Sequence, residues 1–414
     1  MNAAVNAFFL IFKLLSLYFL AVSLFCLCRR KKPAASAGQR RFAILIAARN
    51  EESCIAGLIE SLQAQRYPRE LFDIWVLPNN CTDHTVEAAQ RAGARIMEMP
   101  SSVRSKGAAL QYAADTLLRG QQHYDAFCVF DADNEADPAF LAEMNQALSR
   151  SAIVKSRILA KNRMQAGISA CYEIYFCTAN RFLNRAREAL GLSARVIGTG
   201  FSIRRDLLEA LGGFPCCTLA EDAELYAACL SHGIRIGYCE SAVIYDEQPT
   251  KLGQSLMQRA RWIKGYLQVF SRYGFRMFKK MLVDGSFSCF DMIMNNIPCL
   301  VLTCATLIFN AIMAVAGIVT RTPDMNVCIL SVVTGLLGSM MTLWFVGGVT
   351  CITQRKNIHA SAKMKVVGVL AFPLFVFTYA ISMLYAVFTN IEWKPIKHTA
   401  VSYTHLTLPT TPYV

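Results

Sequence analysis

Hydrophobic residues form two kinds of pattern along the chain. Between residues 41 and 130, apolar runs of strand length (42–47, 72–78, 94–99 and 126–130) alternate with helical stretches at 51–65, 83–92 and 103–118. Near both ends the apolar runs are longer and almost uncharged. The alternation predicts βαβ units, and therefore a largely parallel sheet with helices on both faces.

Beyond residue 150 the pattern is more helical and more basic. It predicts a strand at 152–159, a loop at Gly198-Thr199-Gly200, a helix at 218–231 and a pair of strands at 234–239 and 242–246. In the stretch 251–280, Lys and Arg are interspersed with Leu, Phe, Trp and Tyr. This mixture is typical of an amphipathic helix that lies on a membrane surface.

Four long apolar runs, at 8–28, 296–320, 327–353 and 366–389, are each long enough to cross a hydrocarbon layer of about 30 Å as a helix. The first run precedes four basic residues, 29–32, and lacks the flanks of a cleaved signal peptide, so we expect a retained anchor. Basic loops place 29–295 and 354–365 in the cytoplasm. The sequence thus predicts an integral membrane protein, of the plasma (inner) membrane, with a cytoplasmic catalytic domain.

Composition supports this mixed character. The hydrophobic share is 54% and the formal net charge is +13. Neither zinc-finger spacing nor an RNA-binding aromatic signature accompanies the charge, so we expect anionic lipid head groups and no nucleic acid as partner. The 16 cysteines form no CxxC pair, and most of them are expected to be buried thiols. Residues 401–414 resemble translated adapter or vector sequence and are set aside as non-native.

Polar residues follow three of the predicted strands. Residues 48–51 follow the first, 79–83 the second, and Asp131-Ala132-Asp133 the fourth. Because ligands of parallel sheets bind beyond the carboxyl ends of the strands, we expect these residues to share one rim. Two carboxylates one residue apart can present oxygens to a divalent ion, which can neutralise a diphosphate. A solvated turn would explain the same pair.

Three further motifs have both a structural and a chemical explanation. Lys106-Gly107 can approach a phosphate or simply begin a helix. Glu221-Asp222 are ordinary acids for a first helical turn, or one of them is a general base. Helical spacing places Gln258, Arg261 and Trp262 on one face, where Arg can bind phosphate and Trp can stack on a sugar; a membrane-surface helix also favours both residues.

Taken in order, these motifs resemble those of the membrane-integrated members of glycosyltransferase family 2, a group that includes cellulose, chitin and hyaluronan synthases and bacterial N-acetylglucosaminyltransferases. The resemblance spans about 41–265 and includes an ARNEE-like turn, a DNCTD-like loop, a KG pair, DxD, an ED pair and QxxRW. It implies an α/β GT-A (Rossmann-like) cytoplasmic domain with transmembrane helices. The domains expected are an anchor at 1–32, the GT-A domain at 40–250, interface helices with QxxRW at 251–295, and three transmembrane helices at 296–390.

The resemblance also implies roles for individual residues in an inverting transfer from a UDP-sugar, with GlcNAc or Glc as the sugar. Asp222 is the expected catalytic base, and Asp133 with Asp131 is expected to hold Mg²⁺ or Mn²⁺. The nucleotide sugar is expected to bind Ala48, Arg49, Glu51, Asn79, Lys106, Asp131, Gln258 and Arg261, and the acceptor to bind Trp262 and Glu221. Three positions depart from the family pattern: Asn79 replaces an Asp that binds uracil, Ala47 a Pro, and Ala220 the Thr of TED.

Two products fit these motifs. One is a β-linked oligo- or polysaccharide, which QxxRW and several C-terminal helices favour; the other is a lipid that receives a single sugar. A non-catalytic scaffold that binds nucleotide or lipid is the alternative of another class, and Asn79 is the feature that favours it. The sequence does not specify the oligomeric state.

Overall fold

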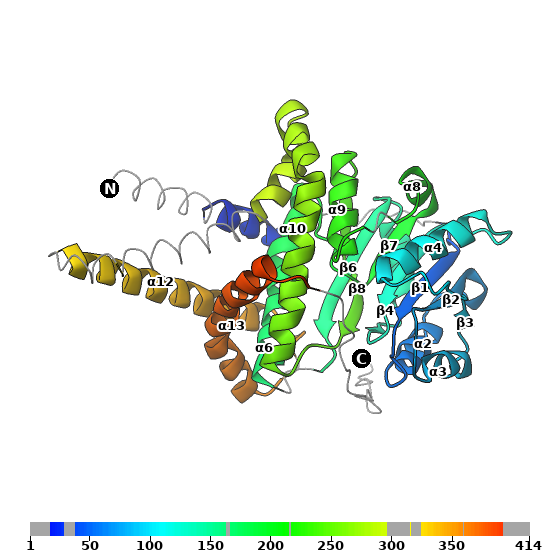
Figure 1. Ribbon diagram of the computed structural model, residues 1–414, viewed down its shortest axis with the longest axis horizontal. Coiled ribbons are helices and arrows are strands. Elements are labelled where there is room, and N and C mark those ends of the chain that lie inside the picture. The colour runs from blue at the N-terminus through cyan, green and yellow to red at the C-terminus, as the bar shows by residue number, and fades with distance from the viewer. Residues whose placement is uncertain are drawn as a thin grey trace, which may run out of the picture.

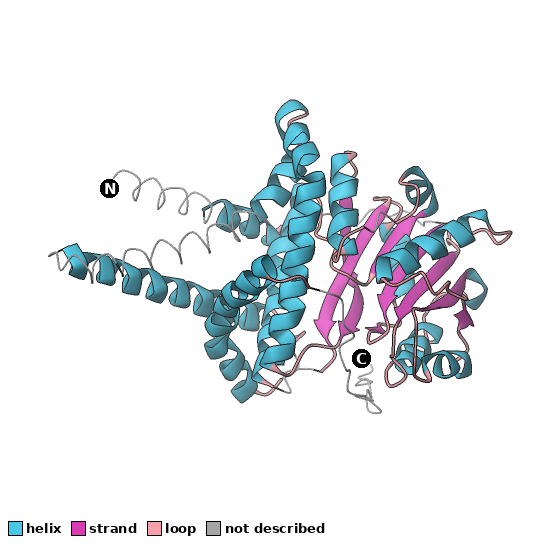
Figure 2. Ribbon diagram, viewed as in Figure 1, coloured by secondary structure: helices cyan, strands magenta, loops and turns pink. Residues whose placement is uncertain are grey.

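The computed structural model describes residues 17–28, 38–162, 166–214, 217–295, 315, 324–358 and 360–391. Its centre is a sheet of eight strands in the order β3-β2-β1-β4-β7-β6-β8-β5 (Figures 1 and 2). The strands are β1 Phe42–Ala48, β2 Phe72–Pro78, β3 Arg95–Ile96, β4 Ala126–Asp131, β5 Glu135–Ala136, β6 Ile153–Ala160, β7 Phe201–Arg204 and β8 Ile236–Asp246.

Helices cover both faces of this sheet. They are α2 Ile55–Gln63, α3 Thr85–Arg91, α4 Lys106–Arg119, α5 Phe140–Ala147, α6 Gly167–Thr178, α7 Ala186–Leu190, α8 Arg205–Ala210, α9 Glu221–Ser231, α10 Leu252–Val283, α12 Asp324–Thr353 and α13 Ala362–Phe388. Strand β1 shows how the two cores arise: Phe42, Ile44 and Ile46 pack against α2 and α5, whereas Ala43 and Leu45 pack against α4. Because successive side chains of a strand point to opposite faces of the sheet, the buried strand β1 contributes to both apolar layers.

The first half of the predicted fold is confirmed. Strand β1 pairs in parallel with both β2 and β4, and α2, α3 and α4 coincide with the predicted helical stretches. Strand β3 is shorter than the predicted 94–99. The parallel edges bring the carboxyl ends of β1, β2 and β4 to one rim, as the sequence predicted.

The second half departs from a parallel sheet. Strand β7 runs antiparallel to both β4 and β6, and β5 antiparallel to β8, so the sheet is mixed. The strand pair expected at 234–239 and 242–246 is wrong, because it is a single strand, β8. Its register against β6 shifts where Cys239 pairs with Ser156 and Val243 with Arg157. A β-bulge at residues 240–242 therefore interrupts the pairing with β6 without ending the strand.

Two of the predicted spans correspond to described helices. The predicted spans 327–353 and 366–389 fall in α12 and α13, whose apolar stretches Leu336–Thr353 and Ala362–Phe388 are long enough to cross a membrane. Phe345 on α12 is 72% exposed, and Phe388 on α13 is 81% exposed. The predicted span 296–320 lies outside the described residues except for position 315, and of 8–28 only 17–28 is described.

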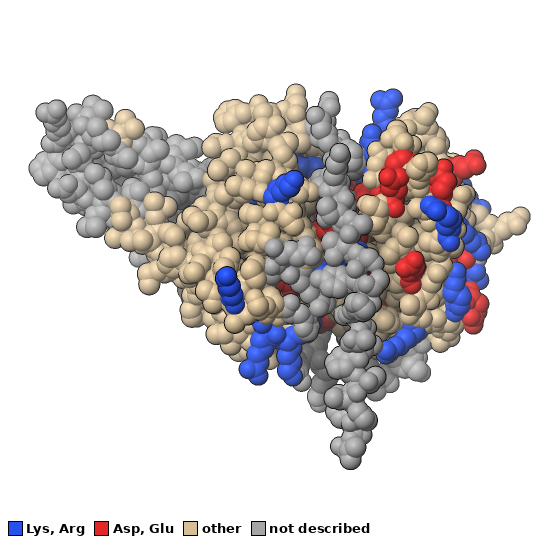
Figure 3. Space-filling model, turned by 90° about the horizontal axis from the view of Figure 1, so that it is seen from below, with Lys and Arg blue, Asp and Glu red and all other residues tan. Residues whose placement is uncertain are grey.

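The apolar helices are attached to the sheet domain through α6 and α10 (Figure 1). Arg259 of α10 is fully buried; its guanidinium donates to the carbonyl of Phe375 at 2.9 Å and to Thr378 Oγ1 at 2.8 Å, both in α13. It also lies over the rings of Phe375 and Tyr379. On the face shown in Figure 3, Asp and Glu gather over the sheet domain, whereas the described helical part is mostly uncharged.

Candidate active site

A cavity of about 230 Å³ crosses the carboxyl ends of β1, β2 and β4, bordered by α4, α6, α9 and α10. Every residue to which the sequence assigned a role lines it: Ala48, Arg49, Glu51, Asn79, Lys106, Asp131, Asp133, Glu221, Asp222, Gln258, Arg261 and Trp262. Residues from both ends of the GT-A-like region therefore meet in one place. Their individual roles stay predictions.

The acidic pair is held by the turn that follows β4. The backbone N–H of Asp131 donates to Thr199 Oγ1 at 2.9 Å and to Asn134 Oδ1 at 3.2 Å. Asp133 is 8% exposed, and its Oδ1 accepts from Asn134 Nδ2 at 3.3 Å. The turn thus holds both carboxylates at the cavity wall instead of in bulk solvent.

A third carboxylate, Asp246, lies beside this pair and was missed from the sequence. Asn134 Nδ2 donates to Asp246 Oδ1 at 2.7 Å, and Gln248 Nε2 donates to Oδ2 at 2.8 Å. Burial, and then the negative charges of Asp133 and Asp131, raise the pKa of Asp246 well above its usual range. Asp246 ends β8, so the strand-end rule that found Asp131 would have found it too.

The acidic pair fits a divalent ion shared with a diphosphate. Within the described ranges, no group of three or more His, Cys, Asp or Glu side chains could hold a metal ion. Mg²⁺ usually keeps several waters and binds one or two carboxylates together with substrate phosphates. Asp131, Asp133 and Asp246 lie close enough for their negative charges to repel one another, and a bound cation would offset that repulsion.

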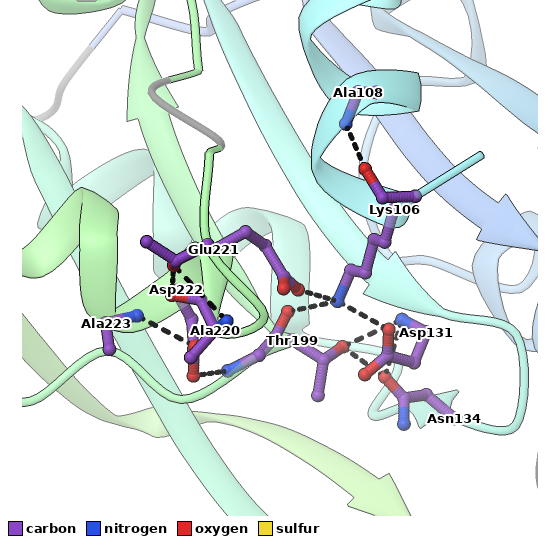
Figure 4. Close-up of polar contacts among 12 residues, drawn as sticks. Lys106, Ala108, Asp131, Asn134, Thr199, Ala220, Glu221, Asp222 and Ala223 are labelled. Atoms are coloured by element: carbon purple, nitrogen blue, oxygen red, sulfur yellow. Dashed lines mark hydrogen bonds and ion pairs between the residues drawn. The ribbon is translucent and has the colours of Figure 1, made fainter. Parts of the chain in front are cut away.

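Lys106 connects the acidic pair to the opposite wall (Figure 4). It is the first residue of α4, where Ser105 caps the helix by accepting from the N–H of Ala108. Its Nζ lies 2.6 Å from Asp131 Oδ1 and 3.1 Å from Glu221 Oε1. Burial alone would lower the pKa of Lys106, but these two carboxylates outweigh it and raise the pKa.

The first turn of α9 carries three acids with different surroundings. Asp222 lines the cavity; its Oδ2 accepts from the N–H of Gly198 at 2.6 Å and its Oδ1 from the N–H of Ala223 at 2.7 Å (Figure 4). Glu224 is fully buried, and its Oε2 accepts from the N–H groups of Cys217 and Thr218. Glu224 therefore stabilises the preceding loop, which leaves Glu221 and Asp222 for chemistry.

The loop Gly198-Thr199-Gly200 joins the acidic pair to Asp222. Its Gly198 carbonyl accepts from Lys106 Nζ at 2.6 Å. A Cβ on Gly200, whose φ is +64°, would lie 2.4 Å from Ile244 Cδ1, so only glycine fits. Beneath the loop, the buried Lys155 Nζ donates to the carbonyl of Thr199 at 2.6 Å. Burial lowers the pKa of Lys155 to about 7, although nearby Asp246, Asp222 and Asp131 oppose the shift.

Helix α10 forms the wall opposite the strand ends. Gln258, Arg261 and Trp262 all line the cavity, as their spacing predicted. Gln258 Oε1 accepts from the Tyr172 hydroxyl at 3.1 Å, and the Trp262 ring meets the Tyr172 ring edge-on, with centroids 6.4 Å apart. One helical turn further, Tyr266 contacts Arg195, a cavity residue that sequence reasoning missed.

The mixed sheet, the acidic pair after β4 and the cavity at the strand ends define the GT-A fold of glycosyltransferases that use nucleotide sugars. The chain superimposes on a mannosyltransferase from Pyrobaculum calidifontis, solved with GDP-Man and Mn²⁺, with a TM-score of 0.61, 16% identity, and coverage of 93% of this chain and 97% of that one. At that identity, the likeness shows the fold alone.

The chain belongs to glycosyltransferase family 2, because the sequence profile described as "Glycosyltransferase like family 2" matches residues 39–265. It is 25% identical over 251 residues to the probable glycosyltransferase YdaM of Bacillus subtilis, which is 58% of each protein. It is also 25% identical over 240 residues to a beta-monoglucosyldiacylglycerol synthase of Synechocystis, which is 56% of this chain and 48% of that protein. Each match spans less than two thirds of the relative's length.

Proposed function

We propose that this chain transfers a sugar from a UDP-sugar to a hydroxyl of a lipid acceptor, with inversion at the anomeric carbon. The observation that carries the proposal is the convergence of all six motif elements on one cavity. Beta-monoglucosyldiacylglycerol synthases among the relatives, and α12 and α13 beside the cavity domain, favour a lipid acceptor over the polysaccharide product that the sequence favoured. Glc or GlcNAc remains the predicted sugar.

The donor is proposed to occupy the strand-end side of the cavity. Asn79 at the end of β2 would contact the base, and Ala48, Arg49 and Glu51 would line the nucleoside pocket. Lys106, Gln258 and Arg261 would contact the diphosphate. Asp131 and Asp133 would hold Mg²⁺ or Mn²⁺, which when bound supplies positive charge against the diphosphate.

Asp222 is proposed as the general base. It receives the proton of the acceptor hydroxyl while the hydroxyl oxygen bonds to the anomeric carbon and the bond from that carbon to the diphosphate oxygen breaks. The bonding electrons leave with UDP, so one displacement inverts the configuration. The N–H groups of Gly198 and Ala223 orient the carboxylate. Trp262 would support the acceptor, and Glu221, across from Asp131, would steady its approach.

Asp222→Asn tests this assignment. The amide keeps the size of the side chain but cannot take a proton, so the turnover number should fall by about 10²–10⁴-fold. Release of UDP is measured with purified full-length protein, Mn²⁺ and a panel of UDP-sugars, and donor binding is measured by calorimetry. Glu224→Gln, in the same helical turn but outside the cavity lining, controls for disturbance of α9. Turnover of Asp222→Asn within a few fold of wild type would remove the base assignment.

The same measurements separate an enzyme from a scaffold. A non-catalytic scaffold would bind a UDP-sugar by calorimetry without releasing UDP in any lipid mixture. Wild-type turnover that disappears in Asp222→Asn while donor binding persists excludes that alternative.

A further inference from the structure

The cations that line the cavity have different surroundings. Lys106 is paired with Asp131 and Glu221. Arg195 lines the same cavity together with the aromatic residues Tyr175, Phe176, Trp262 and Tyr266. In the described part of the chain, no carboxylate lies within ion-pair distance of the Arg195 guanidinium. The charge of Arg195 therefore has no acid paired with it.

The polar partners of Arg195 are few. Its Nη2 donates to the Tyr266 hydroxyl, and its guanidinium lies 4.8 Å from the centre of the Tyr266 ring. Its Nε is buried without a hydrogen-bond partner. Leaving a guanidinium N–H buried and unpaired is unfavourable, because the group loses its hydration without replacement. The Arg195 side chain is thus held in place with its Nε donor unpaired.

Arg187, a fully buried arginine, shows how an acid compensates such a charge elsewhere in the chain. Arg187 is 1% exposed and is paired with Asp291 through two hydrogen bonds, Nε to Oδ2 at 2.6 Å and Nη2 to Oδ1 at 2.9 Å. Its Nη1, like Nε of Arg195, has no hydrogen-bond partner, so the two side chains differ in the paired acid. Arg195 has no such acid, and Asp222, which acts on it at longer range, already accepts from Gly198 and Ala223. The missing anion is therefore expected to come from a ligand.

We propose, on the basis of the transferase function above, that Arg195 binds a phosphate of the acceptor, so that the acceptor is a hydroxyl-bearing phospholipid head group. Guanidinium groups bind phosphate through two parallel hydrogen bonds. The reacting hydroxyl belongs beside Asp222 and the phosphate beside Arg195, which anchors it and takes no part in bond breaking.

The position of this subsite favours a lipid as the source of the phosphate. Tyr175 of the cavity wall approaches Tyr379 of α13, with ring centroids 6.5 Å apart. Helices α6, α10 and α13 pack together, so the aromatic side of the cavity borders the apolar helix α13 (Figure 1). A phospholipid can place its head group at Arg195 while its chains remain along α13.

The test compares three acceptors with the full-length protein in detergent micelles, using Mn²⁺ and whichever UDP-sugar binds by calorimetry. Phosphatidylglycerol offers hydroxyls and a phosphodiester, dioleoylglycerol a hydroxyl alone, and glycerol 3-phosphate hydroxyls and a phosphate monoester without acyl chains. Labelled sugar in each product is quantified. We expect phosphatidylglycerol to be glycosylated, with kcat/KM at least about tenfold above that of dioleoylglycerol.

Variants at position 195 link the preference to this side chain. Arg195→Gln should raise the KM for phosphatidylglycerol by about tenfold or more, and Arg195→Lys should recover part of the loss. Arg150→Gln, at an exposed arginine outside the cavity lining, is the matched control. A merely structural role would instead lower kcat for both lipids alike.

The acceptor comparison distinguishes the phosphate subsite, the lipid source and the proposed function. Glycosylation of dioleoylglycerol as efficient as that of phosphatidylglycerol overturns the inference, and wild-type protein alone suffices for that comparison if a variant does not fold. Efficient use of glycerol 3-phosphate that depends on Arg195 upholds the phosphate subsite but overturns the lipid source. Failure of wild type to bind any UDP-sugar overturns the proposed function instead.

Discussion

At the scale of single residues, the buried cations of the site differ in what compensates them. Lys106 is surrounded by carboxylates, whereas Lys155 is fully buried against the backbone carbonyls of Thr199 and Gly200. Lys155 supports the loop whose Gly198 orients Asp222 and whose Thr199 accepts from Asp131. Its side chain does not line the cavity, so we regard it as a positioning residue.

Lys155 should make stability depend on pH in a predictable direction. Its pKa is about 7 in the fold against an ordinary 10.5, so between these values the folded chain binds fewer protons than the unfolded chain. The contribution of Lys155 to the free energy of unfolding therefore rises with pH between about 7 and 10.5, by up to about 1.4 kcal/mol per pH unit, and is level below 7. Thermal unfolding of wild type and Lys155→Met from pH 6 to 10 isolates this effect. An unchanging difference between the two would contradict it.

At the scale of elements, the sequence predicted what depends on local pattern and missed what depends on distant partners. The strands β1, β2 and β4 are continuous apolar runs followed by polar residues, and all three were found with their site residues. Strand β7 has only four residues after a glycine loop, and its place between β4 and β6 is set by tertiary pairing. Arg195 was missed for the same reason, because its importance arises from Tyr266 on a remote helix.

One turn of helix α10 both lines the cavity and attaches the apolar helix α13. Gln258 faces the cavity, and the adjacent Arg259 is buried against α13. Arg259→Gln should destabilise this junction by about 2–4 kcal/mol, since charged hydrogen bonds and contacts with two aromatic rings are lost. The thermal midpoint of the purified protein in detergent is the measurement. Arg276→Gln, on the exposed side of the same helix, is the matched control. Equal shifts for both variants would show that Arg259 does not hold the helices together.

At the scale of the whole molecule, an α/β domain of glycosyltransferase family 2 is joined to apolar helices through helix α10. The acidic cluster lies in the α/β part, while α12 and α13 expose large apolar side chains such as Phe345 and Phe388. Exposed apolar surface of this extent is unfavourable in water and is covered in a bilayer. We therefore propose that the chain is an integral membrane protein with its cavity near the membrane surface.

Fractionation tests that proposal. Membranes from cells that produce the full chain are washed first with 1 M salt and then with alkaline carbonate. The chain should stay in the pellet after both washes, because helices that cross the bilayer are held by burial of apolar side chains and not by charge. A peripheral protein of the same membranes serves as the control. Release by carbonate would show that α12 and α13 do not span.

The bridge that Lys106 makes between Asp131 and Glu221 has a consequence for the order of events. In the proposed function, a diphosphate that enters the cavity would compete for the same ammonium group, so that Glu221 would lose its partner and become available to the second substrate. Binding of the donor would then complete the site. We propose that this order delays assembly of the reactive arrangement until the donor has arrived, and so protects the activated sugar from hydrolysis.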